Sequence, residues 1–383
     1  MLAAIACLAL MGMDSQVIVP THLVATASKE RLSIGYAGVD YYQPSQYFTH
    51  CASYTWLRSS CYDTPANSDP PRAQLISDLQ FTKRQDLGSV QRVWISLDQL
   101  MRWGPKGAFE GFVPGGLHNV DDMLSLDHRY QIKVILVLFV YDSAHDANEF
   151  QPTALDGNHS RLRHGYLRAD RLFIGHLAGN SVDVSTAPIV ELANEPYFQF
   201  EEYFNDPSNL GRFRACASNG RTDWGCVDTK IIHPWLSELY ATARQASTRF
   251  KYTFSDTGRL FENYGYWSRM YPQDLIDEHL YDSAPWAKAW LYARGRRFPK
   301  PWIATEVGCD TGAVSCTYSG TASAPVDEWW LTHLRADGAQ AVLVDSHVTL
   351  WQYPDGPDSQ VPTKTGRDVM LATKTNAPSP ATP

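Results

Sequence analysis

No apolar run in this sequence of 383 residues is long enough to cross a membrane, since a spanning helix needs about 20 such residues. Basic clusters are missing as well: 33 Lys and Arg face 41 Asp and Glu, a formal net charge of −8. Nucleic acids and anionic membranes are therefore not expected as partners. Neither a CxxC pair nor a histidine-rich stretch occurs, so no metal is expected, and no organic cofactor either.

Cysteine is scarce, but six of the seven cysteines form three close pairs: Cys51/Cys61, Cys216/Cys226 and Cys309/Cys316. We predict a disulfide within each pair, although six cysteines allow other connectivities. Disulfides persist in oxidising compartments, so the pairs indicate a secreted protein.

The two ends of the chain differ in composition from the rest. Residues 1–27 open with a short apolar stretch and end in Ala25-Thr26-Ala27, as signal peptides do. We expect a signal peptide or an apolar N-terminal arm here, and Cys7 also resembles the anchor site of a lipoprotein. Residues 373–383 are rich in Pro and Thr and are expected to be a disordered tail.

Between these ends, over residues 28–372, short apolar runs alternate with helix-like stretches. Strands are expected near residues 32–39, 90–96, 133–141, 188–195, 251–255, 275–281, 302–306 and 341–351, and helices near 71–85, 162–177, 228–248 and 326–337. This alternation predicts an α/β fold, and eight strands predict a single-domain (β/α)8 TIM barrel. No final helix is evident between residues 355 and 373, so either it is missing or the N-terminal arm covers the gap.

Glu195 lies at the end of the apolar stretch that begins at Pro188. Pro196 follows it and ends the strand. A carboxyl group at the end of a buried strand would tend to keep its proton and could donate it to a leaving group. A solvent-exposed turn after a core strand is the alternative.

Glu306 closes a second stretch of the same design, Trp302 to Glu306, followed by Gly308. About three strand–helix units of roughly 30 residues fit between Glu195 and Glu306. The two carboxylates would then end strands four and seven and lie at the same rim of the barrel.

These two strand ends resemble the retaining glycoside hydrolases of clan A, most closely family 5, which contains cellulases and mannanases. The resemblance implies that Glu195, preceded by Asn194, is the acid/base and that Glu306 is the nucleophile. It also implies that Asn194 binds the 2-hydroxyl of the sugar.

Further strand-end residues match the family pattern. Arg92 matches an arginine beside the nucleophile. His279 and Tyr281 match a His-x-Tyr motif, in which the tyrosine would hold the nucleophile and the histidine would orient the sugar or the acid/base. Trp351 matches a tryptophan beneath the sugar, provided that strand eight extends that far. The family's histidine after strand three has only a loose counterpart in His145, and Asp142 is an alternative sugar ligand there.

Aromatic residues are abundant, with 12 Trp, 20 Tyr and 15 Phe, and those near strand ends could pack against sugar rings. We name Tyr41, Trp94 and Tyr197 as candidates, while core packing explains most of the others.

The sequence thus favours a secreted, monomeric, retaining β-glycosidase that acts within a β-1,4-glucan or mannan chain. An exo-acting β-glycosidase of the same clan is the first alternative. A carbohydrate-binding barrel without turnover is the second, although two carboxylates at matched strand ends argue against it. In each case the partner is an oligosaccharide or polysaccharide.

Overall fold

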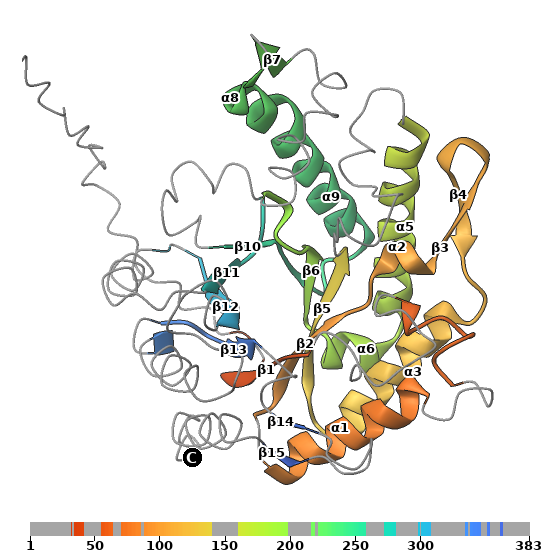
Figure 1. The fold of residues 1–383 in the computed structure, drawn as a ribbon, viewed down its shortest axis with the longest axis vertical. Coiled ribbons are helices and arrows are strands. Elements are labelled where there is room, and N and C mark those ends of the chain that lie inside the picture. Colours follow the sequence, from red (N-terminus) through yellow and green to blue (C-terminus); the bar gives the residue numbers. More distant parts are fainter. Residues whose placement is uncertain are drawn as a thin grey trace, which may run out of the picture.

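The computed structural model describes residues 32, 34–41, 55–63, 70–85, 88–139, 160–197, 216–218, 221–257, 272–280, 298, 300–307, 334–335, 338–345, 351–352 and 361–362. Their centre is a parallel sheet through which the chain winds in sequence order (Figure 1). Its strands are β1 (Ala37–Tyr41), β2 (Val90–Trp94), β5 (Lys133–Phe139), β6 (Ile189–Ala193), β9 (Lys251–Thr253), β10 (Ser255–Thr257), β11 (Ile276–Leu280), β12 (Trp302–Val307) and β13 (Val342–Asp345). Strands such as β5 are apolar almost throughout because a parallel sheet is covered on both faces.

The sheet curves towards a ring, and its ladder of paired strands is open between β9 and β10. β1 pairs with both β2 and β13, so the first and last of these strands are neighbours. The ladder ends at β9, which pairs with β6, and at β10, which pairs with β11. Only Phe254 separates β9 from β10, so the two ends of the ladder are joined by the chain itself. Counting β9 and β10 as one bent strand, the described residues contain the eight strands of the expected barrel.

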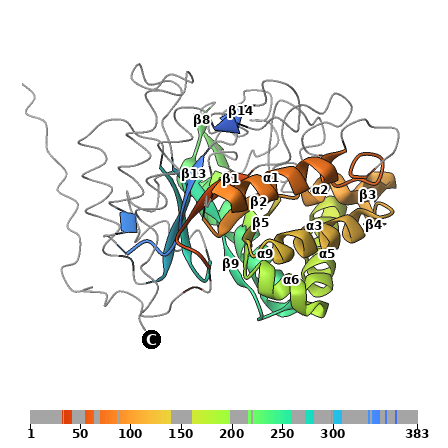
Figure 2. The ribbon, with the colours of Figure 1, turned by 90° about the horizontal axis from the view of Figure 1, so that it is seen from below.

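Helices cover the half of the ring formed by β1, β2, β5, β6 and β9 (Figure 2). They are α1 (Pro71–Gln85), α3 (Gly116–Arg129), α5 (Ser160–Gly179), α6 (Ser181–Thr186) and α9 (His233–Ala246). In α9 the buried residues Trp235, Leu236, Leu239 and Ala243 recur at helical spacing and join the main core. No helix among the described residues is long and apolar enough to span a membrane.

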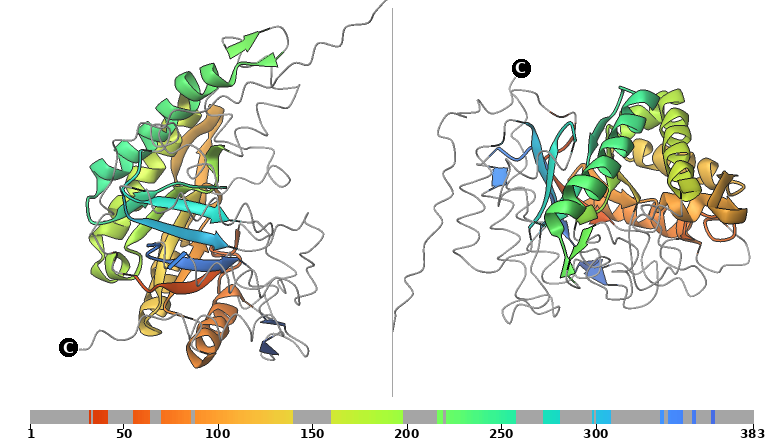
Figure 3. Two further views of the ribbon diagram at one scale, coloured as in Figure 1. Left: turned by 90° about the vertical axis from the view of Figure 1, so that its left-hand side faces the viewer. Right: turned by 90° about the horizontal axis from the view of Figure 1, so that it is seen from above.

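A separate apolar cluster fills the inside of the ring near the amino ends of the strands. It combines residues from opposite sides of the ring, which can meet only in its interior: Val90, Ile135, Ile189, Leu275, Ile303, Ala341 and Leu343. Alternate residues of a strand point to the same face. Arg92 and Glu191, two positions after Val90 and Ile189, therefore also point inward, one layer closer to the carboxyl ends, and the parallel strands bring these ends to one rim (Figure 3).

The structure also differs from the sequence-based expectations. Between strands two and three it contains the hairpin β3 (Met101–Gly104) and β4 (Ala108–Phe112), the short helices α2 (Leu97–Leu100) and η2 (Pro105–Gly107), and α3, none of which was predicted. The sequence left open whether strand eight runs from residue 341 as far as Trp351. In the structure this strand is β13, and Trp351 belongs to β14 (Trp351–Gln352), which pairs antiparallel with β15 (Val361–Pro362) in a separate sheet. Of the helix expected near residues 326–337, only Leu334 and Arg335 are described as helical.

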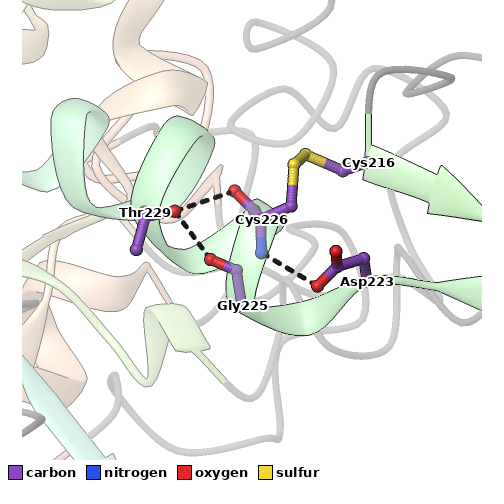
Figure 4. The surroundings of a disulfide bond; sticks show 5 residues. All are labelled: Cys216, Asp223, Gly225, Cys226 and Thr229. Atoms are coloured by element: carbon purple, nitrogen blue, oxygen red, sulfur yellow. Dashed lines mark hydrogen bonds between the residues drawn. A yellow bond between two sulfur atoms is a disulfide. The ribbon is translucent and has the colours of Figure 1, made fainter.

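The disulfide predicted between Cys216 and Cys226 is present (Figure 4). It joins the hairpin of β7 (Ala217–Ser218) and β8 (Arg221–Thr222) to α8 (Trp224–Val227), which continues through η5 (Asp228–Ile232) into α9. Asp223 caps α8, its Oδ1 accepting the amide N–H of Cys226 at 3.1 Å. Cys61 is also disulfide-bonded, to a cysteine outside the described residues. Cys51, Cys309 and Cys316 lie outside them too, so those two pairings stay predictions.

The fold contains buried carboxyl groups that should make its stability fall as the pH rises. Asp170 of α5 is fully buried, neither of its oxygens has a hydrogen-bond partner among the described residues, and burial raises its pKa well above the ordinary value. A group whose pKa is raised by folding contributes its full stability below its unfolded pKa of about 3.9. It loses that stability as the pH rises through the folded pKa.

We therefore expect Asp170→Asn, which cannot ionise, to flatten the decline of the unfolding free energy above about pH 4. Urea unfolding from about pH 4 into the alkaline range would measure this slope, with Asp63→Asn at an exposed position as the control. Identical slopes in the wild type and Asp170→Asn would contradict the expectation.

Candidate active site

Arg92 connects three strands at the inner face of the barrel. Its side chain has no exposed surface. Nε donates to Oε2 of Glu191 at 2.6 Å, and Nη2 donates to Oε1 of the same carboxylate at 2.7 Å. Nη2 also donates to Oδ1 of Asn194 at 2.6 Å, and Nη1 donates to Glu306. One guanidinium from β2 thus holds side chains from β6 and β12 in place.

Glu191 is the structural counter-ion of Arg92. It is fully buried, and besides the two bonds from Arg92 its Oε1 accepts a hydrogen bond from the hydroxyl of Ser255 at 2.5 Å. A buried charge is tolerated when it is paired and hydrogen-bonded. Glu191 therefore belongs to the support of the site rather than to its reacting surface.

Glu195 follows β6 in an uncommon backbone conformation, with φ of 40°. Its N–H donates to Oγ of Ser255 at 3.1 Å, and the N–H of Asn194 donates to the carbonyl of Phe139 at 2.9 Å. Positive φ at a residue other than glycine costs about 1–3 kcal/mol and is concentrated at functional sites. The bend turns the carboxylate of Glu195 towards β11 and leaves 16% of the side chain exposed.

Glu306 reaches the same region through an irregularity in β12. The register of β11 and β12 shifts between Asp277 and His279, and that of β12 and β13 shifts between Ala304 and Val307. Such a bulge breaks strict alternation, so consecutive residues can both face inward. Thr305 and Glu306 both contact His279 for this reason.

His279 of β11 lies between the two carboxylates. Its Nδ1 is 2.7 Å from Oε1 of Glu195 and 3.3 Å from Oε2 of Glu306. Burial lowers the pKa of His279, outweighing the hydrogen bond from Glu195 that acts in the opposite direction. The imidazole is therefore neutral near pH 7.

Oxygen atoms of Glu195 and Glu306 and a ring nitrogen of His279 all lie within 4.8 Å of one another, a spacing that a metal ion could accept. Arg92, however, already places a cation on Glu306, and a second cation there would be repelled. The donor set fits better as two carboxyl groups that act directly on a substrate.

The structure brings Arg92, Asn194, Glu195, His279 and Glu306 together, five of the residues singled out from the sequence. Trp94 lies next to them, with Cζ of Arg92 5.6 Å from the centroid of its ring. Tyr197 is buried, 7% exposed, and packs against Trp224, which favours a core role over a sugar contact. Tyr281, Asp142 and His145 lie outside the described residues, as do the side chains of Tyr41 and Trp351.

Sequence reasoning missed the supporting residues Glu191, Ser255, Asp277 and Thr305. The alternation of inward residues could have indicated three of them, because Glu191, Asp277 and Thr305 each lie two positions after a residue of the inner apolar cluster, Ile189, Leu275 or Ile303. Glu306, directly after Thr305, becomes an inward residue only through the bulge, which leaves no mark in the sequence.

Together, the fold and this group of residues define a (β/α)8 barrel with a paired-carboxylate site at the carboxyl ends of its strands. No protein-family model and no curated protein sequence matches this chain. Solved structures do match, and over most of its length. A β-mannanase from the blue mussel Mytilus edulis has a TM-score of 0.55 at 13% identity and covers 89% of this chain and 92% of its own.

Two further solved structures share this fold. A β-1,4-D-mannanase from Cryptopygus antarcticus has a TM-score of 0.52 at 16% identity and covers 89% of both chains. An apo β-glucosidase, 1317, has a TM-score of 0.58 at 10% identity and covers 90% of this chain and 99% of its own. At identities of this level the likeness establishes the fold, which is that of TIM-barrel glycoside hydrolases.

The arrangement around Arg92 predicts that Glu191→Gln is strongly destabilising. Removing one member of a buried ion pair typically costs about 3–5 kcal/mol. Here Arg92 would lose its bidentate partner and keep its contact with Glu306. Glu238→Gln is the matched control, since Glu238 forms an exposed pair with Arg163, and such pairs contribute about 0–1 kcal/mol. Urea unfolding of both variants would measure the difference, and equal small losses would show that Glu191 does not support Arg92.

Proposed function

We propose that this protein is a retaining β-glycosidase that cleaves a β-1,4-linked mannan or glucan. The observation that carries the proposal is the pair Glu195 and Glu306, which have carboxylate oxygens within 4.8 Å of each other at the end of the barrel. In retaining enzymes the two carboxyl groups are about 5–5.5 Å apart, whereas inverting enzymes need about 6.5–9.5 Å to admit a water. The spacing therefore supports the retaining class, as does the resemblance to family 5 of clan A.

The different surroundings of the two carboxyl groups suggest their roles. Glu306 is nearly buried and accepts a hydrogen bond from Arg92, whose positive charge favours the ionised form that a nucleophile needs. Glu195 is more exposed and contacts the neutral imidazole of His279, so it can hold a proton and later exchange it with water.

The reaction would proceed in two steps. Glu306 attacks the anomeric carbon while Glu195 gives its proton to the departing glycosidic oxygen, which forms a glycosyl-enzyme ester. Glu195, now ionised, removes a proton from water as the water attacks the same carbon, and Glu306 leaves as a carboxylate. Because Oδ1 of Asn194 accepts from Arg92, Asn194 would donate from Nδ2 to a sugar hydroxyl near the reacting carbon.

Mannan is the substrate that we favour, because β-mannanases from a mussel and from Cryptopygus antarcticus share this fold. An exo-acting enzyme is the second candidate, because an exo-β-1,4-mannosidase from an Opitutaceae bacterium and the β-glucosidase share it as well. Secretion is proposed on the ground of the disulfides, of which Cys216–Cys226 is one.

Glu195→Gln should lower hydrolysis of natural glycans by a factor of roughly 10²–10⁴, the usual contribution of general acid–base catalysis. Substrates with a good leaving group should suffer less in the first step, because they need little protonation. Reducing-sugar release from a panel of mannans and glucans would measure this, and product size would separate endo from exo action. Glu238→Gln on the exposed face of α9 is the control.

Near-normal turnover by Glu195→Gln would remove Glu195 from the mechanism. Absence of product from every glycan in the wild type would instead favour a carbohydrate-binding barrel.

The proposed pair also predicts the stereochemistry. Two displacements at one carbon retain its configuration, so a β-linked substrate should first release the β-anomer. Proton NMR of the early product would detect it, and a 2-deoxy-2-fluoro glycoside of the matching sugar should label Glu306. The α-anomer as the first product, or a label on another carboxylate, would show that the pair is assigned wrongly.

A further inference from the structure

His279 is linked on its far side to two residues that have no part in the proposed chemistry. Its Nε2 is 3.2 Å from Oγ1 of Thr305, and that hydroxyl is 2.8 Å from Oδ1 of Asp277. All three residues are fully buried. The contacts form a chain from Asp277 through Thr305 and His279 to Oε1 of Glu195 at 2.7 Å.

Each contact in this chain restricts where the next proton can lie. Oδ1 of Asp277 accepts the backbone N–H of Thr305 at 3.2 Å, so this oxygen already acts as an acceptor. The shorter contact to the same oxygen is then donation by the hydroxyl of Thr305. Since that hydroxyl has only one proton, its contact with Nε2 requires the imidazole to be the donor.

The ring is neutral, so a proton on Nε2 leaves a lone pair on Nδ1. Burial lowers the pKa of His279, and burial raises the pKa of Asp277 well above its ordinary value. A neutral Asp277 supplies no negative charge that would draw a second proton onto the ring. Among the described residues the other charged groups near His279 are Arg92, which lowers the pKa of the ring, Glu191, which raises it, and Glu306, whose Oε2 lies 3.3 Å from Nδ1.

We infer that Thr305 and Asp277 are positioning residues that fix His279 as the Nε2–H tautomer, so that Nδ1 accepts the proton of Glu195 and holds Glu195 in its acid form. The inference rests on the proposed role of Glu195 and deepens it. Thr305 points inward towards His279 because it lies two positions after Ile303 of the inner cluster, and the bulge in β12 turns Glu306 inward beside it. Two consecutive residues of one strand would thus prepare the acid and supply the nucleophile.

Thr305→Val tests this inference, because valine keeps the shape of threonine and removes the hydroxyl. Without the hydroxyl, Nε2–H loses Oγ1 of Thr305 as its acceptor, whereas the Nδ1–H form still gains donation to Glu195. That form favours ionised Glu195. The alkaline limb of the pH profile of kcat/KM should therefore move to lower pH by about one unit, which corresponds to a tenfold loss of the acid form of Glu195 on that limb. Thr305→Ser keeps the hydroxyl and should restore the wild-type limb.

The tautomer itself can be observed without turnover. Long-range proton–nitrogen NMR of histidine-labelled protein distinguishes the two neutral forms, and the signals of His279 are assigned by their absence in His279→Gln. We expect Nε2–H in the wild type and in Thr305→Ser, and Nδ1–H in Thr305→Val. Asp277→Asn retains an acceptor oxygen and should keep the wild-type tautomer. A changed tautomer in Asp277→Asn would show instead that an ionised aspartate is required.

An Nδ1–H signal in the wild type would overturn the inference, as would an unchanged tautomer and alkaline limb in Thr305→Val. If Thr305→Val does not fold, as judged by loss of a cooperative melting transition, the wild-type tautomer decides the question. Failure of the proposed function is recognised separately, since a protein that hydrolyses no glycan still yields the NMR result.

Discussion

The burial of Arg92 is the constraint on which the rest of the site depends. A guanidinium without exposed surface must be paired, and here Glu191, Asn194 and Glu306 pair with it from two other strands. These contacts around Arg92 can therefore form only when β2, β6 and β12 keep their observed positions relative to one another along the barrel axis. The same contacts place the proposed nucleophile, so the charge balance of the interior and the geometry of the reaction are set by one group.

The interior of the barrel is layered in a way that makes this charge tolerable. Apolar residues such as Ile135 and Leu343 fill the amino end, and the polar network occupies the layer above them. A polar layer is stable only when its members satisfy one another, because an unpaired buried group is costly. The hydroxyl of Ser255 satisfies two of these groups at once, because it donates to Glu191 and accepts the backbone N–H of Glu195. The strained residue is thereby fixed to the same network as the cation.

The outline of the site could be predicted from the sequence because it follows from local rules. Apolar runs that end in a carboxylate mark strand ends, and strand ends of a barrel share one rim, so Glu195 and Glu306 were expected to meet. The supporting residues could not be predicted in the same way. Ser255 reaches Glu191 from a different strand, and the hairpin of β3 and β4 depends on packing against α5 as well as on its turn residues Gly104 and Pro105. Trp351 could match the family tryptophan only if strand eight extended that far, and the chain forms β14 there instead.

The two carboxyl groups are chemically identical, so their different roles must come from their neighbours. Arg92 brings a full positive charge to Glu306, whereas His279 brings a neutral ring to Glu195. Exchanging these neighbours would exchange the preferred protonation states, since a cation favours a carboxylate and a lone pair favours a carboxylic acid. The neutrality of His279 is as necessary as the charge of Arg92, because an imidazolium between the two groups would favour ionisation of both. Burial of the ring, with Asp277 behind it at a pKa that burial raises, is the physical means by which this fold would keep one carboxyl group as an acid beside another that is ionised.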